Sequence, residues 1–186
     1  DRSVSAIDAE RVASEEGEVE RKQVEEKKQV EEEQVKEKPL RKIDDELYER
    51  LRRKTPSSSI RKAVNKGVVL PMNDFALPGL KITTPLQADH IVSMDKISRM
   101  EGFDKLSFKD QLEILNYRDN FIGLSESANK SKGSKSYKDW QYYKKDTSEE
   151  IEVCPEFREK MIDRENQLTK DLQNLINIKQ KGVNNI

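Results

Sequence analysis

The chain has 186 residues and carries 35 Lys and Arg against 36 Asp and Glu, a net charge of −1. Charged residues make up 38% of it and hydrophobic residues 33%. Average domains carry about 25% charged and 45–50% apolar residues, so we expect one compact domain of about 100 residues with solvated helical extensions. One cysteine and one histidine exclude an internal disulfide and Cys₂His₂ or Cys₄ zinc sites. No apolar run reaches the about 18 residues of a membrane span.

The net charge near zero hides a basic middle. Residues 1–54 and 146–186 each carry a net charge of −3, whereas residues 55–145 carry +5. Polyanion binding depends on charge within about a Debye length, so nucleic-acid binding is expected in the middle segment. We divide the chain into a charged helical extension or linker (1–54), a central domain (55–145) and a C-terminal helix that packs on or beside that domain (146–186).

The first 38 residues are a low-complexity segment rich in Glu, Gln, Lys and Val. Glu and Lys favour helix, but the valines are spaced five and six residues apart and do not line a coiled-coil seam. We therefore predict a solvated helix or a partly disordered linker that ends at Pro39. Residues 40–54 predict a short amphipathic helix with Ile43, Leu47 and Leu51 on one face. We place the domain boundary at the Pro- and Ser-rich residues 55–59.

The central segment predicts two short strands and a helix after the second. Residues 86–92 form the first strand and 121–124 the second, with a helix opened by Ser107 between them and a brief strand at 68–70. Ser125 is the predicted N-cap of the following helix. A capping box at 136–139 leads to an aromatic run that we interpret as packed under a helix, with base stacking as the alternative. The last helix, from 155 to about 181, presents an apolar stripe for docking on the core or, alternatively, for dimerisation.

Polar residues accompany these two strands in a fixed order. Asp89 and His90 lie at the end of the first strand, Asn120 precedes the second, and Asn129 lies in the helix that follows. A lone histidine at a strand end is more often structural than catalytic, so the order, the spacing and the local basic charge must be taken together. The run Asp89-His90-Ile91, then Asn120-x₈-Asn129-x₂-Lys132, resembles HNH endonucleases of the ββα-metal fold, in the variant with Asn at the third position.

This resemblance implies an α+β fold with a ββα-metal (HNH) core and mostly helical extensions. It implies an enzyme that hydrolyses DNA phosphodiester bonds with little sequence specificity, leaving 5′-phosphate and 3′-hydroxyl ends. His90 would be the general base, Asn120 would tether the loop between the strands, and Asp89 and Asn129 would hold one divalent cation. Mg²⁺ is expected, with Mn²⁺, Ni²⁺ and Zn²⁺ as alternatives. An imidazole suits base catalysis near pH 7, and Mg²⁺ prefers oxygen ligands.

Basic residues around this motif are candidates for contact with DNA. Lys and Arg neutralise backbone phosphates and give salt-dependent, largely sequence-independent binding. The residues expected to do so are Arg118, Lys130, Lys132, Lys135 and Lys138.

The segment between His90 and Asn120 is longer than the family's compact hairpin and holds its own helix and a Gly102-Phe103 turn. This variant resembles the C-terminal nuclease domains of bacterial polymorphic toxins. The resemblance implies a bacterial effector, secreted or delivered into a target cell, that acts in the cytoplasm and has a cognate immunity protein. It leaves the oligomeric state open.

Two alternatives remain at the level of sequence. One is a non-enzymatic nucleic-acid-binding or scaffold protein with charged helices. The other is a thiol hydrolase that uses Cys154 with His90 and an asparagine, although no local signature surrounds the cysteine.

Overall fold

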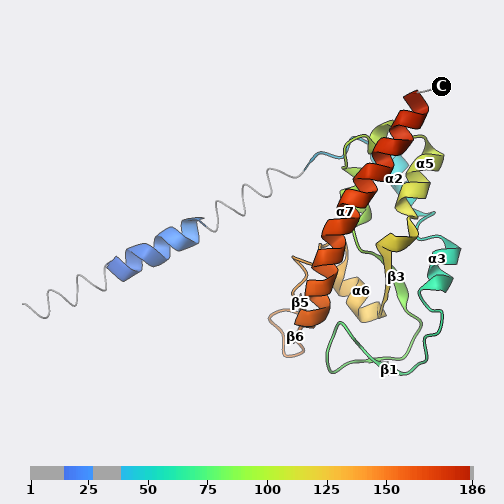
Figure 1. Cartoon of the computed structure of the whole chain (residues 1–186). Helices are drawn as coiled ribbons and strands as arrows, with labels where there is room; N and C mark the ends of the chain where they lie inside the picture. The colour runs from blue at the N-terminus through green and yellow to red at the C-terminus, as the bar shows by residue number, and fades with distance from the viewer. Residues whose placement is uncertain (1–14, 27–38, 185–186) are drawn as a thin grey trace, which may run out of the picture. The chain divides into compact units, whose positions relative to one another are not determined.

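The computed structural model describes residues 15–26 and 39–184, with side chains up to residue 182. The chain divides into two compact units, Asp1–Leu40 and Arg41–Ile186. In the first unit, residues 15–26 form a helix (blue in Figure 1) whose Val19 and Val24 are each 54% exposed. This agrees with the predicted solvated helix, while the predictions for residues 1–14 and 27–38 lie outside the described residues.

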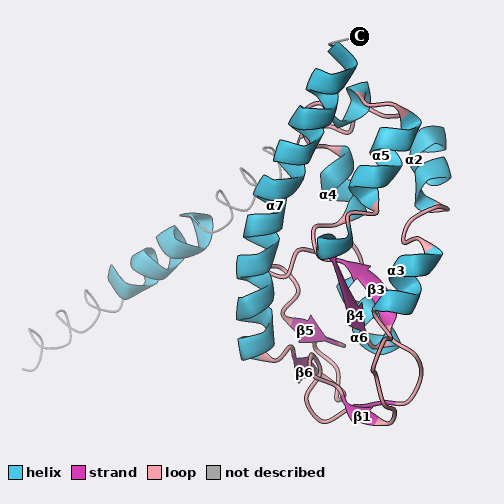
Figure 2. Ribbon diagram, turned by 45° about the vertical axis from the view of Figure 1, so that its right-hand side comes forward, coloured by secondary structure: helices cyan, strands magenta, loops and turns pink. Residues whose placement is uncertain are grey.

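The second unit mixes helices with short antiparallel strands (Figure 2), which confirms the predicted α+β class. The strands form three two-stranded sheets, β1-β2, β3-β4 and β5-β6. In chain order the elements are α2 (Asp45–Arg52), α3 (Ser58–Ala63), β1 (Met72–Asn73), β2 (Lys81–Ile82), β3 (Gln87–His90), α4 (Met94–Ser98), η1 (Phe103–Lys105), α5 (Phe108–Leu115), η2 (Arg118–Asn120), β4 (Phe121–Leu124), α6 (Glu126–Lys132), β5 (Tyr142–Tyr143), β6 (Ile151–Glu152) and α7 (Pro155–Asn184).

β3, β4 and α6 form a strand–strand–helix unit. The two strands pair antiparallel from Gln87 opposite Leu124 to His90 opposite Phe121, and α6 contacts both of them. The second strand lies at the predicted residues, and α6 begins where the Ser125 hydroxyl accepts a hydrogen bond from the Ala128 amide at 3.1 Å. The end of β4 and the start of α6 are therefore fixed by one helix cap.

The long helix α7 covers the core of this unit (Figures 1 and 2). The apolar stripe of this helix, from which docking on the core is predicted, contributes four buried side chains, Met161, Leu168, Leu172 and Ile176. They join one cluster with side chains from most of the other elements, including Leu51, Ile91, Ile97, Phe103 and Leu115. Burial of this apolar face is the main force that holds α7 in place.

The compact unit begins before the predicted domain boundary. Leu51 of α2 is fully buried and Ile43 nearly so, and α2 contacts α5. Thr55 is buried as well, and its hydroxyl lies 3.1 Å from the carbonyl oxygen of Leu115. The boundary predicted after residue 54 is therefore wrong, because the amphipathic face of α2 completes the core. Of the Pro- and Ser-rich residues, 55–57 connect α2 to α3, and Ser58 and Ser59 belong to α3 itself.

Two further local predictions are wrong. Residues 68–70 form no strand, and Val69 is 79% exposed. Ser136 accepts a hydrogen bond from the amide of Asp139, as a cap does, but only a single turn follows. Trp140 is nonetheless buried, and its indole N–H donates to the Ser131 hydroxyl at 2.9 Å. Ser131 belongs to α6, so Trp140 packs against a helix, as the packing interpretation requires.

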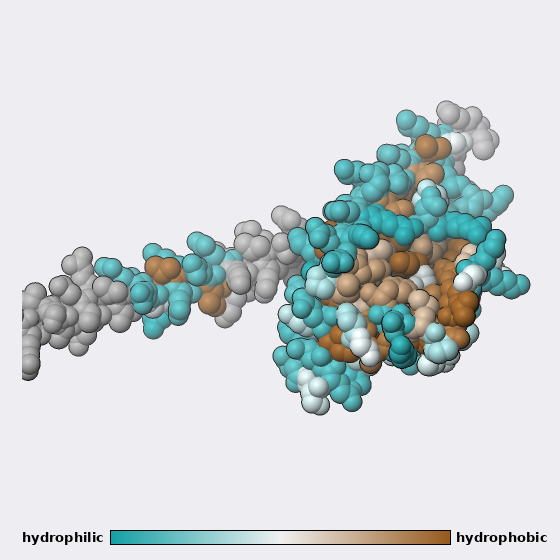
Figure 3. All heavy atoms as spheres, turned by 60° about the horizontal axis from the view of Figure 1, so that its bottom comes forward, coloured by the Kyte–Doolittle hydropathy of each residue, from teal (hydrophilic) through white to brown (hydrophobic). Residues whose placement is uncertain are grey.

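One end of the second unit exposes apolar surface. Seen from the end that carries β1, Figure 3 shows hydrophobic residues surrounded by a hydrophilic rim.

Across the described residues, no helix combines the length and the hydrophobicity that a membrane crossing requires.

Candidate active site

Three of the predicted site residues line one hollow. Asp89, His90 and Asn129 meet at a surface hollow of about 350 Å³. Asp89 and His90 come from the end of β3 and Asn129 from the middle of α6. The remaining lining residues are Tyr48, Arg52, Ala88, Ser93, Met94, Asp95, Gly133 and Ser134. Cys154 is not among them, so the hollow gives no support to a thiol hydrolase.

His90 is held by the Nε2 side of its ring. Nε2 lies 2.9 Å from the carbonyl oxygen of Leu115 and 3.2 Å from the hydroxyl of Thr55. Because a carbonyl oxygen can only accept, the proton of the neutral ring must sit on Nε2, which leaves the lone pair on Nδ1. The ring also packs on Phe121, with centroids 4.3 Å apart. This geometry fixes both the tautomer and the orientation of the imidazole.

Burial sets the protonation state of His90. It lowers the pKa of the ring from 6.5 to about 4, the nearby charge of Lys132 acts in the same direction, and the hydrogen bond to Leu115 opposes them. The imidazole is therefore neutral at pH 7 and can accept a proton at Nδ1.

Asp89 is buried in a hydrogen-bonded ion pair. Its side chain is 4% exposed, and Oδ2 accepts from the Tyr137 hydroxyl at 3.0 Å and lies 3.2 Å from the Lys132 ammonium. Lys132 also donates to Oδ1 at 3.3 Å and to the carbonyl oxygen of His90 at 3.2 Å. Burial raises the pKa of Asp89, while Lys132 and Tyr137 oppose that shift by favouring the charged form. An ionised carboxylate has about four acceptor positions, so these contacts leave room for a further partner.

Lys132 is not placed to bind a nucleic-acid backbone. Its side chain has no exposed area, and its ammonium lies over the Tyr137 ring as well as against Asp89. The prediction that Lys132 contacts phosphate is therefore wrong for this arrangement. The spacing itself explains the error, because residues 129 and 132 are three apart on a helix and share a face. That face points toward Asp89 and the hydrophobic core. The sequence shows that Lys132 is basic, but it does not show that this side chain is buried against Asp89.

Asn120 joins the two ends of the loop between β3 and β4. It has no exposed area, its Oδ1 accepts from the Val92 amide at 2.8 Å, and its Nδ2 donates to the Val92 carbonyl oxygen at 3.0 Å. Its own carbonyl oxygen accepts from the amide of Ile91 at 2.9 Å. These are the contacts that the predicted tether requires, and they end the strand immediately after His90.

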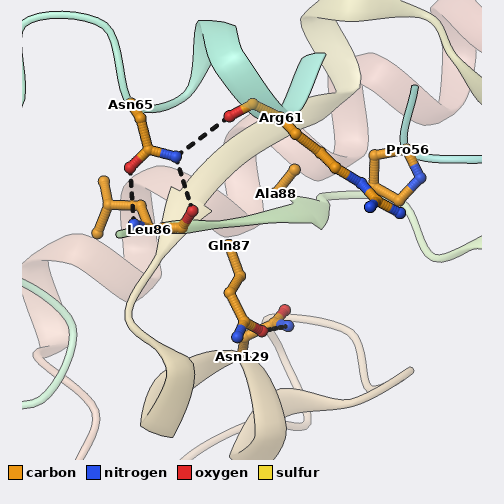
Figure 4. Close-up of a pocket in the computed structure, with 7 residues that line it drawn as sticks. All are labelled: Pro56, Arg61, Asn65, Leu86, Gln87, Ala88 and Asn129. Atoms are coloured by element: carbon orange, nitrogen blue, oxygen red, sulfur yellow. Dashed lines mark hydrogen bonds between the residues drawn. The ribbon is translucent and has the colours of Figure 1, made fainter. Parts of the chain in front are cut away.

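Asn129 presents a free amide oxygen at the rim of the hollow. Its Nδ2 donates to Oε1 of Gln87 at 2.8 Å (Figure 4), and its Oδ1 has no hydrogen-bond partner among the residues that the structure describes. The side chain is half-buried. Asn129 therefore offers an oxygen donor in the hollow that Asp89 and His90 also line.

The other predicted basic residues, Arg118, Lys130, Lys135 and Lys138, are exposed, and Lys130 pairs with Glu126 at 3.0 Å. Sequence reasoning missed Tyr48 and Arg52, because it placed α2 outside the domain. The signal was present in the apolar spacing of α2, since Tyr48 and Arg52 directly follow the core-facing Leu47 and Leu51. Arg52 is exposed in the hollow and lies 3.4 Å from Glu49.

The described residues contain no cluster of three or more His, Cys, Asp or Glu side chains able to hold a metal ion. The candidate ligands are instead a carboxylate and an amide. Comparisons with protein-family models, with curated proteins and with solved structures return no match for this chain.

Proposed function

We propose that the second unit is a metal-dependent endonuclease of the HNH type that hydrolyses DNA with little sequence specificity. The observation that carries this proposal is the hollow shared by His90, Asp89 and Asn129. It combines a neutral imidazole that has a free lone pair with a carboxylate and an amide oxygen. These are the groups that metal-assisted phosphodiester hydrolysis needs.

The order of elements supports the same proposal. β3, β4 and α6 follow one another as the strands and helix of an ββα-metal core do, and Asn120 makes the tether between them. The segment between the strands adds α4, η1 and α5. α5 positions the site from outside the core unit, because the carbonyl oxygen of its last residue, Leu115, holds His90.

The chemistry follows from the fixed tautomer of His90. Nδ1 accepts a proton from a water molecule, the water oxygen forms a bond to phosphorus, and the bond from phosphorus to the 3′ oxygen breaks. The products carry a 5′-phosphate and, once the leaving oxygen is protonated, a 3′-hydroxyl. A bound divalent cation supplies positive charge to the phosphoryl oxygens and the leaving oxygen. The donors fit such a cation, since Mg²⁺ takes oxygen ligands and needs only one or two from protein; Mn²⁺, Ni²⁺ and Zn²⁺ are alternatives.

A plasmid assay tests this proposal. The purified full chain with supercoiled plasmid and Mg²⁺ should produce nicked and linear DNA, and EDTA should stop the reaction. His90→Ala should reduce the rate by about 10²–10⁴-fold, the usual contribution of a general base. Cys154→Ala is the matched control and should keep full activity.

The alternative is passive nucleic-acid binding, which the net charge of +5 on residues 55–145 favours. In that case the plasmid is retarded in a gel and stays intact with each of the four metals. Such a result, or full activity in His90→Ala, contradicts the nuclease.

We further propose, from the sequence resemblance, that the nuclease is the effector domain of a bacterial competition system. It would be secreted or delivered into a target cell, act in the cytoplasm and be held inactive in its producer by an immunity protein. An acidic partner would associate rapidly with the basic segment. Expression in bacteria without an inhibitor should stop growth with the native chain and not with His90→Ala; normal growth with active native chain contradicts this context.

A further inference from the structure

A second hollow lies beside the first, along the edge of β3. It has a volume of about 430 Å³ and shares Ala88 and Asn129 with the hollow that holds His90. Its other lining residues are Pro56, Arg61, Asn65, Leu86 and Gln87. Figure 4 shows Arg61 and Asn129 on opposite sides of β3, with Gln87 directed toward Asn129. The two hollows are therefore neighbours along this strand.

The two hollows differ in charge. The first contains the carboxylates of Asp89 and Asp95, whereas no acidic side chain lines the second. Its only cation is Arg61, which is exposed and forms no ion pair within the part of the chain that the structure describes. The rest of the lining is amide, aliphatic or proline. This composition suits an anionic group rather than a metal ion or a cationic ligand.

Arg61 is also held close to the strand. The Asn65 side chain donates to the carbonyl oxygens of Arg61 at 3.1 Å and of Leu86 at 2.8 Å, and accepts from the Leu86 amide at 2.7 Å. One asparagine thus links the backbone of α3 to the residue before β3 (Figure 4). The backbone that carries the Arg61 side chain is therefore fixed relative to β3.

We propose that this second hollow binds the phosphodiester adjacent to the one that is cleaved, with Arg61 as its cation. The inference rests on the proposed nuclease function and adds to it the path of the substrate along β3. Each DNA strand carries a negative charge about every 3.4 Å along the helix axis, so a strand in the first hollow brings a further phosphate to its neighbour. Arginine can bind phosphate oxygens in a bidentate geometry, and a contact to phosphate carries no base-sequence information, which agrees with low sequence specificity.

The test measures DNA binding as a function of salt. A fluorescent DNA duplex of 12 base pairs is titrated, without added metal, with the full chain carrying His90→Ala at several salt concentrations. Adding Arg61→Gln should weaken binding about tenfold, in line with the loss of a charge-assisted hydrogen bond, and reduce the slope of log affinity against log salt by about one. Arg61→Lys should restore the slope and only part of the affinity, because a lysine keeps the charge without the fork.

Lys62→Gln is the matched control. Lys62 is the next residue of α3, is also exposed and lies outside the hollow, so its substitution should leave the slope nearly unchanged. The inference is overturned if Arg61→Gln reduces the slope no more than Lys62→Gln does. The plasmid assay keeps the two proposals apart: a native chain that cleaves while Arg61→Gln binds normally retains the nuclease and loses the second subsite.

Discussion

At the scale of single residues, the site depends on where protons and charges are held. The Leu115 carbonyl oxygen fixes the proton of His90 on Nε2. Lys132 compensates the charge of the buried Asp89, which also accepts a hydrogen bond from Tyr137. The sequence alone identifies Asp89, His90, Asn120 and Asn129 as candidates, because their order and spacing are visible. It does not show that Lys132 is buried, since exposure depends on which helix face meets the core.

The depressed pKa of His90 predicts a pH dependence of stability. The ring has a pKa of about 6.5 when unfolded and about 4 when folded. Between these values the unfolded chain binds more protons, so the free energy of unfolding falls as the pH falls through this window. The loss should reach roughly 3 kcal/mol at the acidic end.

Urea unfolding between pH 7 and pH 4 measures this effect. His90 is the only histidine of the chain, so the difference between the native chain and His90→Gln isolates its contribution from that of the carboxylates. Glutamine can still donate to the Leu115 carbonyl oxygen. Parallel pH profiles for the two proteins would show that burial does not depress the pKa of His90.

At the scale of elements, local signals predict the parts that local chemistry fixes. Ser125 caps α6 and Ser107 caps α5, and both helices begin where these caps place them. The end of β3 is different, because Ile91 and Val92 have strand-forming side chains and yet lie beyond the strand. There the Asn120 side chain forms hydrogen bonds with the backbone amide and carbonyl oxygen of Val92. The two residues are 28 apart in sequence, so a local pattern cannot predict their contact.

The scale of the whole molecule decides what belongs to the site. The Pro- and Ser-rich residues 55–59 predict a boundary after residue 54, but burial of Leu51 makes α2 part of the core and brings Tyr48 and Arg52 to the hollow. The acidic charge of residues 1–54 is thus a poor guide, because it averages an extension with a packed helix. In the same way, residues 146–186 carry a net charge of −3, and yet the helix α7 within them packs on the domain through its apolar stripe.

We propose that the oxygens of Asp89 and Asn129 hold one divalent cation beside the ring of His90. NMR spectroscopy of the single histidine tests it most directly, with Mn²⁺ as a paramagnetic probe of the full chain. Substoichiometric Mn²⁺ should broaden the Cε1–H signal of His90 in the native chain. Asn129→Ala should prevent the broadening, and Lys130→Ala, a control on the same helix, should not. A His90 signal that stays sharp at Mn²⁺ concentrations that support plasmid cleavage would show that the cation does not bind in this hollow.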